Sequence, residues 1–366
     1  MMNKATGKEK IKIGITIGDF NGVGPELILK TFDDLEILNS FIPVIYGSAR
    51  VFSFYKKSVT AENFVYHAIK SADEAQAGKI NLINVWQEEA KIEPGVSNET
   101  GAKYAVLSLE AATADLLSGK INALVTSPID KSHLEKVNFS FPGHTEYFAN
   151  KAGKESIMLL VHENLRVALV TGHVGINKIS GSLSKELITK KAQLLKETLI
   201  KDFSISRPKI AVLALNPHAG DQGKFGTEEI EIIKPSIEFL QDKGVLVMGP
   251  FSADGFFASG NFKNYDGILA MYHDQGLIPF KTLAGIGGVN FTAGLGFIRT
   301  SPDHGPGFDL AGKDQADPTS FRDALYLAAD LYLTRTNNKE YSKNPLKTLS
   351  GDLLKAQDEP FIEDKE

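Results

Sequence analysis

Short segments that are apolar throughout recur along this sequence, and longer segments with helical periodicity separate them. The clearest apolar runs are Ile11–Ile17, Ile42–Tyr46, Ile80–Val85, Ala123–Thr126, Ile157–Val161, Val167–Thr171, Ile210–Leu215 and Gly267–Met271. Strands that are apolar on both faces are typical of parallel sheets covered by helices on either side. Helices are predicted over 101–118, 183–200, 227–243 and 319–336, and Thr100 is a candidate cap for the first of them. The alternation therefore predicts an α/β fold with a mainly parallel sheet.

The length predicts more than one lobe, since a single hydrophobic core stops growing near ~250–300 residues and this chain has 366. We expect a first α/β lobe formed by residues 11–135 together with 307–350. Residues 136–306 would form a second lobe that carries most of the chemically interesting side chains, and 351–366 would form a charged tail.

Composition excludes several classes of protein and site. Lys and Arg number 40 against 45 Asp and Glu, so no excess of positive charge indicates nucleic-acid binding. The chain has no cysteine, which excludes disulfides, thiolate nucleophiles and thiolate metal ligands. No apolar stretch has the ~18 residues that a membrane span needs, and the charged start does not resemble an export signal. We therefore expect a cytoplasmic protein with no membrane partner.

Three histidines each follow directly after a predicted strand, and they are His173, His218 and His273. The carboxyl ends of parallel strands share one edge of a sheet, so these rings could converge there. Neutral imidazoles suit a divalent transition metal, and Asp274 could orient His273 or act as a further ligand. A histidine after a strand is also commonly a hydrogen-bonded structural residue, and the spacing matches no short metal motif. Both interpretations stay open on the residues alone.

A second group of residues predicts anion recognition. The segment Gly143–Glu146 opens a predicted helix, where free backbone N–H groups favour an anion. Lys281 lies shortly after His273, and Arg299 follows the strand-like segment Gly296–Ile298 in an apolar, glycine-rich stretch. Such donors suit a phosphorylated or carboxylated small substrate. Taken singly, each could instead be a solvated surface charge or a helix cap.

The familiar nucleotide and nucleophile motifs are absent. The loop Gly18–Glu26 matches neither G-x-G-x-x-G nor the Walker A pattern, so a Rossmann domain is unsupported. Neither G-x-S-x-G nor H-E-x-x-H occurs. The residues alone predict a two-lobed α/β enzyme that depends on a histidine-bound metal and acts on a small anion.

Three motifs identify a family resemblance: Asn216–Gly220, Met271–Gly276 and Phe297–Gly305 resemble segments of the 4-hydroxythreonine-4-phosphate dehydrogenases. Further similar segments are Thr16–Glu26, Thr126–Lys131, Pro142–Glu146, Thr171–His173, Gly249–Asp254 and Asp309–Gly312, so the resemblance spans roughly residues 11–333. These are NAD-dependent enzymes of the pyridoxal phosphate pathway. The resemblance implies the isocitrate/isopropylmalate dehydrogenase-like fold, with a cleft between two α/β/α lobes and no Rossmann fingerprint.

Matched position by position, the resemblance also implies the roles of individual residues. His173, His218 and His273 would bind a divalent metal, with zinc expected and magnesium or cobalt as alternatives. Substrate contacts would come from His144, Thr145, Lys281, Asn290 and Arg299. The family is a homodimer with its active sites at the subunit interface, where one metal histidine comes from the partner chain. The cofactor would be NAD or NADP, and no residue is assigned to it.

The implied reaction is oxidation of 4-phosphohydroxy-L-threonine at C3, followed by decarboxylation to 3-amino-2-oxopropyl phosphate. Asp254 is a candidate catalytic residue, and the general base is not assigned. Pro306 stands where the family usually has Thr after Asp-His-Gly, and the segment Ile17–Gly22 differs from the family's first loop. These departures leave a dehydrogenase of D-threonate or D-erythronate 4-phosphate as an alternative. Phosphate acyltransferases of the same broad fold, and a non-enzymatic metabolite sensor, are alternatives from other classes.

Overall fold

The computed structural model describes residues 10–343, and within them twelve strands form one sheet. The strands are β1 (Lys12–Thr16), β2 (Ile42–Gly47), β3 (Tyr66–Ile69), β4 (Ile80–Asn84), β5 (Ala123–Thr126), β6 (Ile157–His162), β7 (Leu165–Leu169), β8 (Ile210–Leu213), β9 (Val247–Phe251), β10 (Gly267–Ala270), β11 (Val289–Ala293) and β12 (Ile298–Pro302). Their order in the sheet is β3-β4-β2-β1-β5-β12-β11-β6-β7-β10-β8-β9. The pairs β6–β7, β6–β11 and β11–β12 are antiparallel, and the other neighbouring pairs are parallel.

The prediction of a mainly parallel α/β fold is confirmed. All eight predicted strands are present, whereas β3, β9, β11 and most of β12 were not predicted. The α-helices are α1 (Gly24–Asp33), α2 (Ala49–Tyr55), α3 (Glu99–Leu117), α4 (His144–Ala152), α5 (Ile179–Ser182), α6 (Lys185–Phe203), α7 (Lys234–Asp242), α8 (Ala253–Ala258), α9 (His273–Ala284) and α10 (Thr319–Tyr341). The predicted cap Thr100 is wrong, because the side chain of Asn98 accepts the hydrogen bond from the Gly101 amide and α3 begins earlier.

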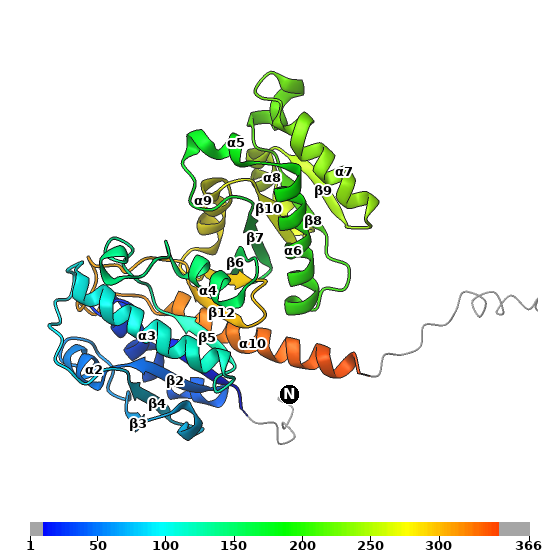
Figure 1. Cartoon of the computed structure of the whole chain (residues 1–366). Helices are drawn as coiled ribbons and strands as arrows, with labels where there is room; N and C mark the ends of the chain where they lie inside the picture. The colour runs from blue at the N-terminus through cyan, green and yellow to red at the C-terminus, as the bar shows by residue number, and fades with distance from the viewer. Residues whose placement is uncertain (1–9, 344–366) are drawn as a thin grey trace, which may run out of the picture.

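The sheet has two halves, each with its own helices (Figure 1). One half contains β1–β5 with α2 and α3, and the other contains β6–β10 with α5–α9. One hydrophobic cluster covers one face along both halves, and two smaller clusters cover the opposite face of each half. The residue boundaries of the two predicted lobes stay a prediction, and the predicted tail lies outside the described residues.

Helix α10 connects the two halves of the sheet. It packs on β5, β11 and β12 and against α6. Its buried Arg335 donates to both carboxylate oxygens of Asp202 on α6, from Nε at 2.5 Å and from Nη2 at 3.2 Å. A bidentate arginine–carboxylate pair fixes the orientation of the two groups as well as their distance. Helix α10 therefore fixes the position of one half of the sheet relative to the other, next to the antiparallel strands. Among the described residues, we find no helix with the length and hydropathy to span a membrane.

Candidate active site

A cavity of about 690 Å³ lies where the two halves of the sheet meet. Its walls come from the ends of β5 and β12, the start of β11, the first turns of α4 and α9, and the loop after β12. All five residues predicted to contact substrate line it: His144, Thr145, Lys281, Asn290 and Arg299. Residues from segments more than 150 positions apart therefore share one cavity.

Arg299 is a buried cation with no carboxylate partner in the described residues. It lies inside β12, and only 2% of its surface is exposed. Its guanidinium donates to Thr126 Oγ1 from Nε at 3.1 Å and to Thr292 Oγ1 from Nη1 at 2.9 Å. Burial lowers its pKa to about 9, with Glu146 opposing the shift. The guanidinium stays charged at neutral pH, so it favours an anion in the cavity.

His144 begins α4 and faces the same guanidinium. Arg299 Nη2 lies 3.0 Å from His144 Nδ1, and because arginine can only donate, Nδ1 must be the acceptor. The proton of the neutral ring then sits on Nε2, a buried atom without a protein partner in the described residues. Burial, together with the charges of Arg299 and Lys131, lowers the pKa of His144 well below its usual value. His144 is therefore a neutral donor at the cavity.

Lys281 and Asn290 supply further polar groups to the cavity. The Lys281 ammonium donates to the Asp303 carbonyl at 2.9 Å and lies 3.5 Å from Asp303 Oδ2. Burial raises the pKa of Asp303. The side-chain oxygen of Asn290 is buried and has no protein partner in the described part of the chain. The cavity thus offers both donors and acceptors, as a ligand with an acidic and a hydroxyl or amino group requires.

Two of the three predicted metal ligands lie together. His173 follows β7 and His273 follows the neighbouring parallel strand β10, and their ring centroids are 5.5 Å apart. His273 Nδ1 lies 2.7 Å from Asp274 Oδ1, so the carboxylate accepts and leaves Nε2 with its lone pair. Burial, followed by Lys131 and His273, lowers the pKa of His173 and favours its neutral form.

His218 lies apart from this pair. It follows β8, the next strand in the sheet, but it lines a neighbouring cavity of about 720 Å³. Asp254 lines that second cavity as well, at the start of α8, where a 2.6 Å hydrogen bond from Ser252 lowers its pKa. Asp274 and Ile278 line both cavities, so the two are adjacent.

The donor set of one chain is therefore incomplete for a three-histidine metal site. Among residues 10–343, no group of three or more His, Cys, Asp or Glu side chains is arranged to hold a metal ion. The pair His173 and His273 fits a metal in its chemistry, because burial favours the neutral form of His173 and Asp274 orients the ring of His273. A third ligand has to come from outside this group.

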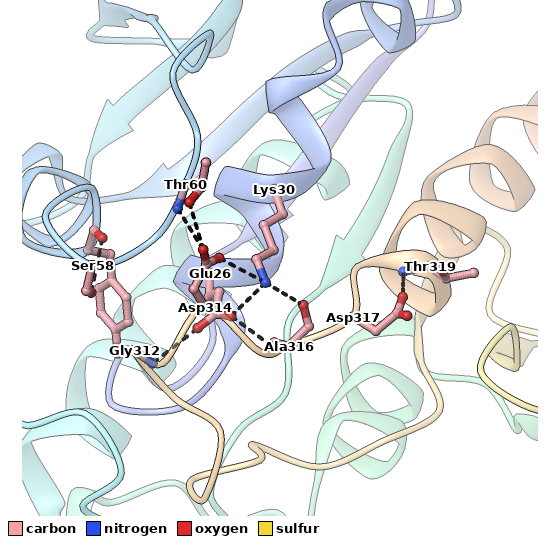
Figure 2. Close-up of polar contacts among 10 residues, drawn as sticks. Glu26, Lys30, Ser58, Thr60, Gly312, Asp314, Ala316, Asp317 and Thr319 are labelled. Carbon is pink, nitrogen blue, oxygen red and sulfur yellow. Dashed lines mark hydrogen bonds and ion pairs between the residues drawn. The ribbon is translucent and has the colours of Figure 1, made fainter.

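A polar network anchors the loop of residues 303–318, which carries Asp303, His304 and Pro306 into the cavity. Figure 2 shows the Lys30 ammonium between Glu26 and Asp314, at 3.1 Å from an oxygen of each. The fully buried Glu26 also accepts hydrogen bonds from the Gly312 and Ala316 amides. The loop wall of the cavity is therefore tied to α1.

Sequence reasoning missed several residues at the site. Thr126 and Thr292 orient Arg299, and Asp303 partners Lys281. Thr126 closes a predicted strand and Asp303 sits in the motif Phe297–Gly305, so position at a strand end was the available signal. Thr292 lies on a strand that was not predicted, so the sequence offered no signal for it.

The fold and the cavity define a class of protein, an α/β enzyme whose cavity suits a small anionic substrate and lies beside a pair of neighbouring histidines. Within this class the chain can be assigned to one family, because residues 39–328 match the family model of the pyridoxal phosphate biosynthetic protein PdxA. The chain belongs to that family, which confirms the resemblance found in the sequence.

Individual relatives agree with this assignment. The chain is 46% identical to a 4-hydroxythreonine-4-phosphate dehydrogenase of Bacteroides thetaiotaomicron, over 93% of this chain and 94% of that one. A crystal structure of the Klebsiella pneumoniae 4-hydroxythreonine-4-phosphate dehydrogenase aligns with a TM-score of 0.77 and 32% identity, over 89% and 99% of the chains. A Cutibacterium acnes protein whose name refers to D-threonate 4-phosphate is 38% identical, over 87% and 93%. The expected fold class and the expected oxidoreductase class are thereby confirmed.

Proposed function

We propose that this chain oxidises 4-phosphohydroxy-L-threonine at C3 with NAD and a divalent metal, and that the product loses CO2 to give 3-amino-2-oxopropyl phosphate. The observation that carries the proposal is the buried Arg299 guanidinium beside the neutral His144 ring, both without an acidic partner in the described residues. A site of this kind is stabilised when an anion arrives.

The protein's own residues would fix which carbon reacts. Arg299, the His144–Thr145 pair and Lys281 would hold the phosphate and carboxylate ends of the substrate, which positions the C3 hydrogen toward the nicotinamide. Hydride leaves C3 for NAD, and the hydroxyl proton passes to a base that is not assigned. The C1–C2 bond of the resulting β-keto acid then breaks with release of CO2, and C2 takes up a proton to give the amino ketone.

The metal would be held by His173 and His273 of one subunit and by His218 of a second copy in a homodimer. This arrangement is supported by the incomplete histidine group in one chain and by the exposure of His218 on the adjacent cavity. Ile278 on α9 lies between the cavities and is 65% exposed, as an interface residue would be in an isolated chain. When bound, zinc or another divalent ion would polarise the substrate's hydroxyl and keto oxygens.

NAD binding is supported by a third cavity of about 410 Å³ that shares Lys281, Asp303 and His304 with the first. Its other walls come from α1, α9 and the loop of residues 303–318, including several glycines that allow a close backbone approach. NADP stays an alternative cofactor. A soluble, cytoplasmic location is part of the same proposal.

The Cutibacterium acnes relative favours one alternative, oxidation of D-threonate 4-phosphate. The carboxylates of Glu146, Asp130 and Asp303 at the cavity favour the amino substrate, because an ammonium group would find acidic neighbours.

The test measures reduction of NAD with each substrate, using enzyme as purified, after chelation and after zinc is restored. We expect fast turnover of 4-phosphohydroxy-L-threonine that chelation abolishes and zinc restores. Preference for D-threonate 4-phosphate would replace the substrate but keep the chemistry. No reduction of NAD or NADP with either substrate would overturn the proposal.

A further inference from the structure

The residues that present His218 adopt a left-handed conformation, which is unusual for residues other than glycine. The φ values are 52° at His218, 51° at Ala219, 40° at Asp221 and 58° at Gln222, with Gly220 between them at 81°. Left-handed helical backbone is unfavourable for L-residues, because it brings Cβ too close to the following carbonyl oxygen. A run of this length therefore needs surrounding contacts that hold it in place.

The carboxylate of Glu229 supplies those contacts at the entrance to the turn. Its Oε1 accepts hydrogen bonds from the Leu215 and Asn216 amides, both at 2.8 Å. Its Oε2 accepts from Asn216 Nδ2 at 2.9 Å. A Cβ at Gly220 would lie 2.7 Å from the same Oε2, so the carboxylate packs directly against the middle of the turn. Glu229 thus contacts the turn both before and after His218.

No cation within residues 10–343 compensates the carboxylate of Glu229. Glu229 is 1% exposed, and within the described range it forms no ion pair with Lys, Arg or His. Burying a carboxylate is costly, and here three N–H donors of the turn are what offset that cost. Glu229 also starts a single π-helical turn, Glu229–Ile233, a rare local form that is frequent at functional sites.

We propose that Glu229 is a positioning residue for His218: its buried carboxylate holds the left-handed turn so that the imidazole is directed toward the metal of the second copy. The inference rests on the proposed function, in which His218 is a metal ligand. Glu229 does not itself contact the substrate cavity. The glutamate acts as the partner that orients a ligand, here through the backbone and Asn216.

The test measures zinc affinity by competition with a chromophoric chelator, using metal-free wild type and the variants Glu229→Gln, Glu231→Gln and His218→Ala. Glutamine keeps one oxygen for the two backbone amides but places an N–H group opposite Asn216 Nδ2. Glu231 is exposed on the same π-helical turn, so its variant matches the charge change without the contact. The cobalt-substituted absorption spectrum gives a second readout, of ligand geometry.

We expect Glu229→Gln to weaken zinc binding roughly 10–100-fold and to alter the cobalt spectrum, as loss of a ligand-orienting partner does. Glu231→Gln should bind as wild type, and His218→Ala should lose the most affinity. Far-UV circular dichroism and the sedimentation coefficient of the metal-free proteins verify that fold and oligomeric state are kept.

Should Glu229→Gln not fold, Asn216→Ala removes the amide donor to Glu229 and Glu228 but leaves the two backbone hydrogen bonds to Glu229 in place. We then expect a smaller loss of zinc affinity in the same direction. Wild-type affinity in the folded Glu229→Gln or in Asn216→Ala, with a loss in His218→Ala, would overturn this inference alone. Equal affinity in wild type and His218→Ala would overturn both the inference and the proposed metal role of His218.

Discussion

The hydrogen bond from Arg299 Nη2 to His144 Nδ1, 3.0 Å long, determines what the cavity can recognise. It leaves the histidine neutral with its remaining proton on Nε2, an atom without a partner among the described residues. The imidazole N–H and the guanidinium, which two buried threonines hold in place, are therefore two donors at the cavity. Both donors for an anion are therefore already in position before a ligand binds.

Replacing Arg299 with Lys should lower kcat/KM roughly 10–100-fold. Lysine keeps the charge but cannot donate to Thr126, Thr292 and His144 at once, and a hydrogen bond to a charged group is worth about 1.5–3 kcal/mol. Steady-state kinetics at varied substrate concentration measures the change. Arg50→Lys is the matched control, since Arg50 is 60% exposed and should leave kcat/KM unchanged. Equal effects of the two substitutions would contradict this role for Arg299.

The lowered pKa of His144 predicts how the stability of the protein depends on pH. Its folded pKa lies well below the unfolded value, so below about pH 6.5 the unfolded chain binds a proton that the folded chain does not. The free energy of unfolding should therefore fall with acidification, by at most about 1.4 kcal/mol per pH unit from this group. In His144→Asn the slope between pH 7 and pH 5 should be smaller by that amount, whereas His67→Asn should retain it. Urea unfolding at several pH values provides the measurement.

The buried carboxyl group of Asp19 should make stability change with pH in the opposite direction to His144. Burial raises its pKa to about 6, and its Oδ2 has no partner among the described residues. Between pH 3.8 and about 6 the folded state binds the extra proton, so stability from this group is lost as pH rises through 6. Asp19→Asn should therefore raise the free energy of unfolding at pH 7.5 by about 1–3 kcal/mol. The gain should vanish near pH 4, and Asp242→Asn on the surface should show none.

Removing Lys30 from the polar network of Figure 2 should lower the stability of the protein. Lys30→Met would leave the buried Glu26 carboxylate without its cation, which costs about 3 kcal/mol or more at such sites. Lys91→Met removes an exposed pair with Glu93 and should cost less than about 1 kcal/mol. Denaturant unfolding of both variants compares the two costs. A small loss for Lys30→Met would mean that the network does not hold the loop of residues 303–318.

The central part of the fold was readable in the sequence because its strands are apolar on both faces. Strands β11 and β12 were not predicted because Asn290, Arg299 and Thr300 interrupt their apolar pattern. Arg299 and Thr300 are buried with hydrogen-bond partners from other elements, Thr126 and Ala324. Strand β9 was not predicted because it contains Gly249 and Pro250, two residues that are uncommon within strands. Residues that serve the site thus broke the local pattern that reveals strands.

The position of the histidines was only partly readable. The edge argument correctly placed His173 and His273 together, because β7 and β10 are parallel neighbours. It could not place His218, because the left-handed turn that follows β8 depends on Glu229, a residue eleven positions further along the chain. The proposed contribution of a second subunit could not be predicted from the positions of residues at strand ends.

Subunit mixing tests the account most directly. His173→Ala and His218→Ala should each be inactive in NAD reduction with 4-phosphohydroxy-L-threonine and zinc. If a site takes His173 from one subunit and His218 from the other, a hybrid dimer has one intact site. Equal mixing with subunit exchange should then restore about a quarter of the wild-type rate. No recovery after demonstrated exchange would contradict a dehydrogenase site shared between two subunits.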